Sequence, residues 1–225
     1  MLDLESIAIS LRLGLAVSVT VALVGPPLAS WLASRRSWLG QLGQGLTLLP
    51  LALPPTVLGL LLVSVMRPDG PLGQALTTLG LATPLFTFTG LWIASCIASL
   101  PIAIQPMLVA FGSIDREVIA AAEVCGATRI ERFCRITFPI ALPGILTGAA
   151  LAFAHSVGQF GVVLMVGGSI PGQTRTASIA IYDDVQLGDF DAAWTTSLAL
   201  IAMSAVVVLA ALVGGGLLGS RSHPS

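Results

Sequence analysis

The charged side chains of this 225-residue chain are concentrated in one short segment. Only 9% of the residues are charged, yet residues 115–132 hold seven of them: Asp115, Arg116, Glu117, Glu123, Arg129, Glu131 and Arg132. The chain has no lysine, so it cannot contain the GxxxxGK[ST] loop that cradles nucleotide phosphates. His155 and His223 stand alone, and the cysteines lack metal-ligand spacing. We therefore expect no catalytic site, metal or cofactor in this chain.

Composition indicates an integral membrane protein. Hydrophobic residues make up 55% of the chain, well above the share typical of a soluble domain. The net charge is −1 and the basic residues form no stripe, which argues against a nucleic-acid partner. Asp3 and Glu5 stand where a signal peptide would carry basic residues, so we expect a retained first helix. Cys96, Cys125 and Cys134 are predicted to be small buried hydrophobes without a disulfide.

Five stretches are long and apolar enough to cross a bilayer as helices of about 20 residues: 10–33, 45–66, 85–110, 139–166 and 194–218. Pro and Gly interrupt all five, which a membrane helix bundle tolerates. Seven of the ten basic residues follow the first, third or fifth stretch: Arg35, Arg36, Arg116, Arg129, Arg132, Arg135 and Arg221. The five stretches predict an all-α polytopic protein. The positive-inside rule places its N-terminus outside and its C-terminus and charged segment in the cytoplasm.

The charged segment has the pattern of a helix, a turn and a second helix. Ser113 or Asp115 can cap a first helix that carries Glu117 at its positive end and runs to about residue 125. Gly126 permits a sharp turn, and TRIE at 128–131 has the T-x-x-E form of a capping box. The capping box predicts that a new helix starts there and leads into the fourth apolar stretch.

One face of the first helix is apolar and low in profile, with Val118, Ala121, Ala122 and Cys125 at i, i+3, i+4 and i+7 spacing. Short side chains let another protein surface approach closely, which favours docking. The alternative is a helix lying on lipid headgroups, although such helices usually carry larger anchors such as Trp, Phe or Leu. Docking is therefore the favoured interpretation.

The segment AAEVCGATRIERFCRITFPIALPG, residues 121–144, resembles the cytoplasmic EAA loop of ATP-binding-cassette importer permeases. Their EAA…G…I.LP pattern is matched at five positions: Ala121, Ala122, Gly126, Ile136 and Pro139. Ala120 replaces the Glu of that pattern and Phe138 replaces its Leu. LPLALPPTVLGLLL at 49–62 and FAHSVGQFGVVLMVGGSIPGQTRTASIAIYDDVQ at 153–186 are similar to the permease subunits of molybdate importers. The three stretches extend the likeness over nearly the whole chain.

This resemblance implies a type I importer permease fold, formed by a single transmembrane domain over residues 1–225. It implies a cytoplasmic coupling loop at 112–135, an outer segment at 168–193 and a coupling helix seated in an ATPase cleft. Nine residues are the implied ATPase contacts: Asp115, Glu117, Val118, Ala121, Ala122, Glu123, Gly126, Ala127 and Arg129. The implied partners are a second copy of the chain, two ATPase subunits that bind the ATP, an extracytoplasmic oxoanion-binding protein and the lipid of a bacterial inner membrane.

The implied function is import of molybdate or tungstate by alternating access, with sulfate or another anion as the nearest alternative. A non-transporting membrane scaffold is the alternative of a different class. Gln105, Ser156 and Gln159 are the candidates for the translocation path, although for each of them a hydrogen bond between two helices is the favoured interpretation. His155 is expected to be a packed, hydrogen-bonded residue.

Two further expectations concern packing. Small residues of the fourth stretch suit close approach of a helix from a second subunit or from the same chain: Gly144, Gly148, Ala149, Ala150 and Ala152. In the outer segment, Thr176, Ile179, Ala180 and Asp183 fit an amphipathic helix, and Arg175 is predicted to be a structural charge rather than an anion contact. We expect this segment to meet a binding protein.

Overall fold

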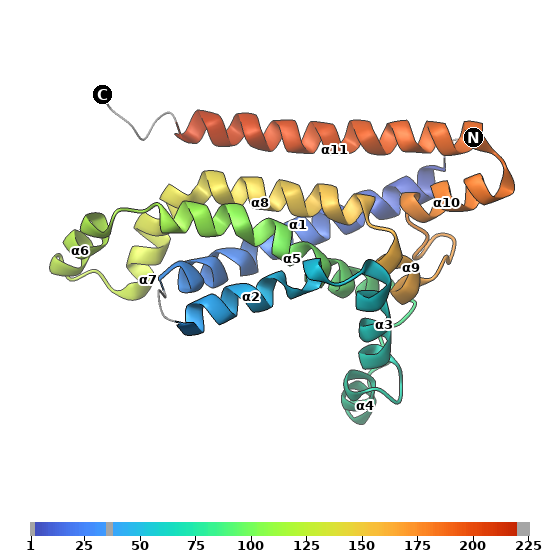
Figure 1. The fold of residues 1–225 in the computed structure, drawn as a ribbon, viewed down its shortest axis with the longest axis horizontal. Coiled ribbons are helices and arrows are strands. Elements are labelled where there is room, and N and C mark those ends of the chain that lie inside the picture. The colour runs from blue at the N-terminus through green and yellow to red at the C-terminus, as the bar shows by residue number, and fades with distance from the viewer. Residues whose placement is uncertain (1–2, 35–37, 220–225) are drawn as a thin grey trace.

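The computed structural model describes residues 3–34 and 38–219, which form helices without any β-strand. Four long helices build the bundle: α1 (Leu4–Ser34), α5 (Phe88–Gly112), α8 (Phe138–Gly158) and α11 (Phe190–Gly219) (Figure 1). Each contains a stretch long and apolar enough to cross a membrane, which confirms the predicted all-α membrane fold. Arg35, Arg36 and Arg221, on which the predicted orientation partly rests, lie outside the described residues.

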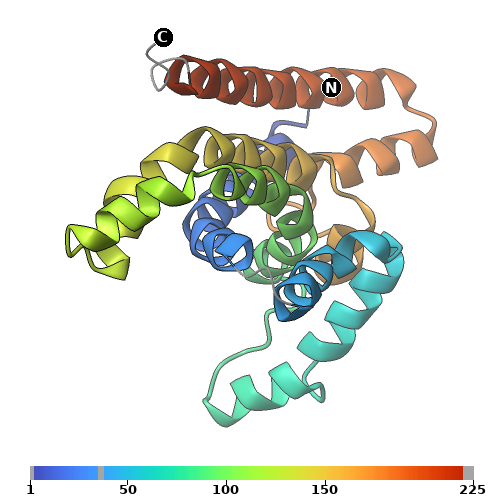
Figure 2. The same cartoon turned by 60° about the vertical axis from the view of Figure 1, so that its left-hand side comes forward.

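The core of the bundle is the contact between α1, α5 and α8, with α11 lying along α8 (Figure 2). Cβ atoms on Gly144 and Gly148 of α8 would lie 2.7 and 2.4 Å from carbonyl oxygens of α5, so only glycine lets the two helices come this close. Ser18 of α1 donates a hydrogen bond to the carbonyl of Ala149 on α8 at 2.7 Å. These small residues of α8 therefore pack against helices of the same chain, which is one of the two arrangements expected for them.

Two of the predicted spans are not continuous helices. The stretch 45–66 is divided into α2 (Trp38–Ala52) and α3 (Pro55–Met66). The chain bends by 104° between Gly40–Ala52 and Pro55–Thr78. Pro54 and Pro55 explain the break, because proline donates no backbone hydrogen bond and disfavours helix in the residue before it. The stretch 139–166 is divided at an extended Gln159 between α8 and α9 (Gly161–Gly167). Counting the bent α2–α3 pair as one span gives the predicted five.

The remaining elements lie at the two ends of the bundle and beside it (Figure 1). One end carries the predicted coupling loop, which folds into α6 (Arg116–Val124), α7 (Arg129–Arg132) and the π-helix η1 (Phe133–Thr137). The other end carries the start of α1 and helix α10 (Ala177–Leu187) of the outer segment. The short helix α4 (Pro71–Thr78) follows α3 and extends away from the bundle. The coupling loop and the outer segment are thus at opposite ends, as the predicted topology requires.

The predicted burial of the cysteines is wrong. Cys125 and Cys134 are exposed and Cys96 is partly buried, and all three are free thiols. Cys125 follows α6 and Cys134 lies in η1, and both belong to the coupling loop at the end of the bundle, which explains their exposure.

Candidate functional site

The first helix of the coupling loop is capped at both ends. Asp115 Oδ1 accepts a hydrogen bond from the backbone N–H of Glu117 at 3.0 Å, so α6 begins at one of the two predicted caps. At the other end Gly126 has φ +78°, and two successive backbone N–H groups donate back to carbonyls of the last turn at 2.9 and 3.0 Å. This pair of bonds is a Schellman ending, which favours glycine because other residues resist positive φ. The predicted turn at Gly126 is confirmed.

The second helix of the loop starts with a capping box. The hydroxyl of Thr128 accepts a hydrogen bond from the N–H of Glu131 at 3.3 Å, and Oε2 of Glu131 accepts one from the N–H of Thr128 at 2.9 Å. Phe133 then anchors the loop to the bundle, because its ring stacks on Phe111 of α5 with 6.2 Å between the ring centroids. The coupling loop is therefore a folded element with a fixed shape.

One edge of α6 faces its own chain, so the predicted docking face is partly wrong. Ala122 is only 9% exposed, and Ile119 packs against the hydrophobic core three residues earlier. The i, i+3, i+4 pattern grouped Ala121 with Ala122, but the structure exposes Ala121 and buries Ala122. The pattern could not show which side of α6 faces the chain, because that depends on how α6 rests against the ends of the long helices.

The outward side of α6 is formed by Glu117, Ala121 and Val124, which are all exposed and share a face at i, i+4 and i+7 spacing. Val124 is 90% exposed, and sequence reasoning missed it although it lies three residues after Ala121. Val118 flanks this side and is 41% exposed. The other implied contacts have different surroundings: Asp115 caps α6, Glu123 forms an ion pair with Arg132, Gly126 and Ala127 form the turn, and Arg129 is exposed on α7.

At the other end of the bundle, Arg175 joins three segments. Its Nη1 atom lies 3.3 Å from a carboxylate oxygen of Asp3 beside the start of α1, and its Nε lies 3.1 Å from a carboxylate oxygen of Asp183 on α10. Ser169 donates to the same oxygen of Asp183 at 3.2 Å. Arg175 is thus a structural charge, as predicted. The predicted amphipathic helix is also present, since Ile179 on its inner face is fully buried.

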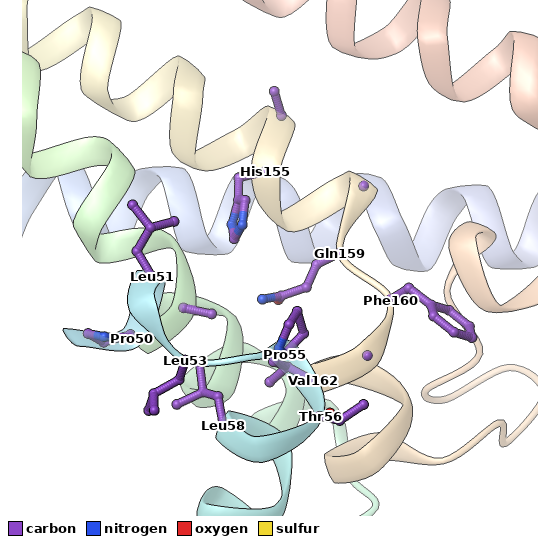
Figure 3. A pocket seen from close by; sticks show the side chains of 14 residues that line it. Pro50, Leu51, Leu53, Pro55, Thr56, Leu58, His155, Gln159, Phe160 and Val162 are labelled. Atoms are coloured by element: carbon purple, nitrogen blue, oxygen red, sulfur yellow. The ribbon is translucent and has the colours of Figure 1, made fainter. Parts of the chain in front are cut away.

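A cavity of about 650 Å³ lies where the two broken spans meet. One wall is formed by prolines and leucines at the α2–α3 break, and the opposite wall by the end of α8 and the start of α9. His155 and Gln159 extend into the cavity from the end of α8 (Figure 3). Nδ1 of His155 lies 3.1 Å from the hydroxyl of Ser99 on α5, which agrees with the predicted packed and hydrogen-bonded histidine.

Residues 25–222 match the family described as the inner membrane component of binding-protein-dependent transport systems. The chain belongs to this family. The matched range includes the coupling loop, the cavity and the outer segment, so all three are parts of one membrane transport component. Membership therefore disfavours the non-transporting scaffold and agrees with a chain that is not itself an ATPase.

Relatives of this inner membrane component are named for molybdenum transport. This chain is 43% identical over 209 residues to the molybdenum transport system permease protein ModB of Azotobacter vinelandii, and the aligned residues cover 92% of each chain. It is 33% identical over 199 residues to the putative molybdenum transport system permease protein YvgM of Bacillus subtilis strain 168, covering 88% of this chain and 87% of that one. It is 36% identical over 178 residues to ModB of Escherichia coli strain K12, covering 77% and 78%.

Solved structures share the fold of this inner membrane component. A chain of the inward-facing MetNI methionine ABC transporter matches it with a TM-score of 0.75 at 16% identity, covering 96% of both chains. A chain of a bacterial alginate ABC transporter in complex with its alginate-bound periplasmic protein matches it with a TM-score of 0.69 at 21% identity. That match covers 92% of this chain and 76% of the other. The predicted fold of an importer permease is confirmed.

The three residues predicted for the translocation path do not line one cavity. Gln159 lines the cavity and is 9% exposed. Ser156 is buried and donates to the carbonyl of Phe153 within its own helix at 3.1 Å, while Gln105 is exposed on α5 and does not line the cavity. Sequence reasoning missed Thr56, which lines the cavity from the start of α3. The sequence signal for Thr56 was the pair of prolines directly before it, which break the helix there.

Proposed function

We propose that this chain is the membrane-spanning subunit of an ATP-driven importer for molybdate or tungstate. It works as a homodimer with two ATPase subunits and receives the oxoanion from an extracytoplasmic binding protein. The path opens alternately to the outside and to the cytoplasm as ATP closes the ATPases. The observation that carries this proposal is the coupling loop, whose helix α6 is fixed by a cap, a glycine turn and an ion pair.

The coupling loop suits the transfer of motion from an ATPase into the membrane. α6 is tied to α7 by the ion pair between Glu123 and Arg132, and α7 continues through η1 into α8 without a break. The far end of α8 borders the cavity at Gly158. A displacement of α6 by a docked ATPase therefore passes along one helical path to the cavity wall. The chain lacks the lysine of a phosphate loop, so the partner supplies ATP hydrolysis.

The substrate and the orientation rest on separate observations. Relatives named for molybdenum transport favour molybdate over sulfate as the cargo. In the proposed orientation the coupling loop lies in the cytoplasm and α10 lies outside. Arg175 is already paired with Asp3 and Asp183, so the outer segment offers no unpaired cation there to a free anion. This surface is suited to a protein partner that delivers the anion.

Reconstitution tests the proposal. The chain is assembled in proteoliposomes with the ATPase and oxoanion-binding protein of the same genome, and uptake of molybdate is measured with and without ATP. We expect ATP-dependent uptake that excess tungstate inhibits and excess sulfate leaves unchanged. Uptake of sulfate instead of molybdate would assign the alternative cargo. Failure to bind any ATPase would overturn the importer assignment itself.

A further inference from the structure

A second cavity lies between the end of α1 and the coupling loop, at the end of the bundle opposite α10 (Figure 1). Its volume is about 660 Å³. The lining includes three residues from the last turns of α1 and three residues of α7: Ser30, Trp31, Ser34, Arg129, Ile130 and Arg132. The cavity therefore lies between a membrane span and the loop outside it.

This second cavity is at the level where α1 leaves the hydrocarbon of the membrane. α1 has 31 residues and is about 46 Å long, whereas the hydrocarbon core is about 30 Å thick, so part of the helix extends into the headgroup region. The apolar stretch of α1 ends near Ser34, and Trp31 is 47% exposed one turn earlier. Tryptophan is enriched at membrane interfaces. The cavity is thus placed to meet lipid headgroups.

The charge of the cavity lining is positive. Arg129 and Arg132 line the cavity, and no carboxylate is among the described residues that do so. Arg132 is partly neutralised by its ion pair with Glu123, whereas Arg129 is exposed and forms no ion pair with another described residue. The carboxylate of Glu131 is held at the helix cap by the N–H and hydroxyl of Thr128, both at 2.9 Å. Arg129 is therefore the cation available to an anionic group, and a guanidinium suits phosphate.

The apolar part of the lining distinguishes a lipid from other anionic ligands. Trp31 and Ile130 provide apolar surface, and Ile130 is 76% exposed. A free phosphate ion would leave this surface in water, whereas the first carbons of an acyl chain would cover it. The outward side of α6, where we propose that the ATPase docks, contributes no residue to the cavity. Both observations favour a lipid as the occupant.

We propose that this cavity binds the headgroup of an anionic phospholipid from the cytoplasmic leaflet. The guanidinium of Arg129 holds the phosphate, and Trp31 and Ile130 contact the upper part of the acyl chains. The hydroxyl of Ser34 donates to the carbonyl of Trp31 at 2.9 Å, so its oxygen remains able to accept a hydrogen bond from a glycerol headgroup. Basic pockets beside membrane helices on the cytoplasmic side bind lipid headgroups in this way. The leaflet follows from the proposed orientation, whereas the binding itself does not depend on the cargo.

Fluorescence quenching by brominated lipid tests the site. Trp31 is made the only tryptophan by replacing Trp38, Trp92 and Trp194 with Phe, and the full chain is reconstituted in phosphatidylcholine vesicles that contain phosphatidylglycerol. Bromine is carried by the acyl chains of one lipid or of the other. One arginine at a membrane surface favours anionic lipid by about fivefold, so we expect phosphatidylglycerol to be preferred at Trp31 by about that factor. The matched control keeps Trp194 alone, which is 64% exposed at the start of α11 and should show no such preference.

Two arginines of the coupling loop separate a site from a general attraction. Arg129→Gln should lower the preference for phosphatidylglycerol by about fivefold. Arg135→Gln removes the same charge from an exposed position on η1 outside the cavity lining and should leave the preference unchanged. Equal loss in both variants overturns the site.

A second measurement guards against damage from the tryptophan substitutions, because Trp92 donates a hydrogen bond to Thr20 at 3.0 Å. Native mass spectrometry of the chain with all its tryptophans counts the phosphatidylglycerol molecules retained by the wild type, Arg129→Gln and Arg135→Gln. We expect fewer retained molecules for Arg129→Gln alone. Equal retention by all three overturns the site.

The remaining outcomes separate this site from other ligands and from the proposed function. Inorganic phosphate that abolishes the preference at matched ionic strength would assign a small-anion site instead. Arg129→Gln that releases the ATPase but keeps the lipid preference would assign Arg129 to the ATPase and overturn the lipid site. No preference at Trp31, in a chain whose complex imports molybdate, overturns the site and leaves the proposed function intact. A preference in a chain whose complex imports nothing supports the site and overturns the function.

Discussion

Arg132 on α7 and Glu123 on α6 form an ion pair that closes the coupling loop across the Gly126 turn. The two partners differ in burial, since the Arg132 side chain is 18% exposed and that of Glu123 is 59% exposed. Losing the carboxylate therefore leaves a largely buried cation without its partner. Losing the arginine leaves only a carboxylate that water can reach.

This asymmetry predicts that Glu123→Gln loosens the loop more than Arg132→Gln does. We expect Glu123→Gln to cost about 1 kcal/mol of local stability, because half of the pair is already solvated. Amide hydrogen exchange over residues 116–132 measures the change. The swapped pair, Glu123→Arg with Arg132→Glu, should recover part of the protection. Equal exchange in both single variants would contradict the assigned asymmetry.

The Gly126 turn depends on backbone conformation rather than on space. Gly126 has φ +78°, and a Cβ there would meet nothing within 4 Å. Gly126→Asn should therefore be tolerated, since Asn adopts the left-handed region more readily than other residues, whereas Gly126→Val should cost about 1–2 kcal/mol or more. Co-purification of the ATPase with each variant reports whether α6 still has the orientation that docking requires. A Val variant that retains the ATPase as well as the Asn variant would show that the turn does not position the docking helix.

The coupling loop was predictable from sequence because its shape is set by local interactions. The Asp115 cap, the Gly126 turn and the Thr128–Glu131 capping box each join residues only a few positions apart. The breaks at Pro54 and Gln159 were missed because membrane bundles tolerate proline and glycine within helices, so the sequence does not say which of them end a helix. The position of Thr56 in the cavity lining was missed for the same reason, since it follows from the break that precedes it.

Gly59 is predicted to be essential for the contact between α3 and α9. A Cβ at this position would lie 2.8 Å from the Cβ of Met165, which is closer than two such atoms approach. Gly59→Leu should therefore push the two helices apart and cost about 1–3 kcal/mol through overpacking. The measurement is the thermal unfolding of the purified complex in detergent. Gly45→Leu is the matched control, because a Cβ there meets nothing within 4 Å and stability should be unchanged.

The proposed orientation can be tested with a native thiol. Cys125 is exposed in the coupling loop. With Cys96 and Cys134 replaced by serine, an impermeant thiol reagent should leave Cys125 unlabelled in intact cells and label it in inside-out vesicles stripped of the ATPase. Leu187→Cys, at the exposed end of α10 in a chain without native cysteines, should show the opposite pattern. Labelling of Cys125 from outside intact cells would reverse the topology.

The faces of α6 give the sharpest test of docking, because two neighbouring alanines point in different directions. Ala121 is exposed on the outward side, whereas Ala122 is 9% exposed and faces its own chain. Ala121→Glu should release the ATPase while leaving the chain itself folded, since the new charge is buried only when the partner docks. Ala122→Glu should instead destabilise the loop by several kcal/mol even without the ATPase, because it buries an unpaired charge within the chain.

Two measurements separate these outcomes. Hydrogen exchange of the isolated chain should change over α6 for Ala122→Glu alone, and ATPase co-purification should be lost for both variants. Gln186→Glu adds the same charge at the exposed end of α10 and should change neither result. Retention of a coupled ATPase by Ala121→Glu would mean that the outward side of α6 is not the docking surface. The membrane-surface interpretation of this helix would then be favoured, and the importer proposal would lose its main physical support.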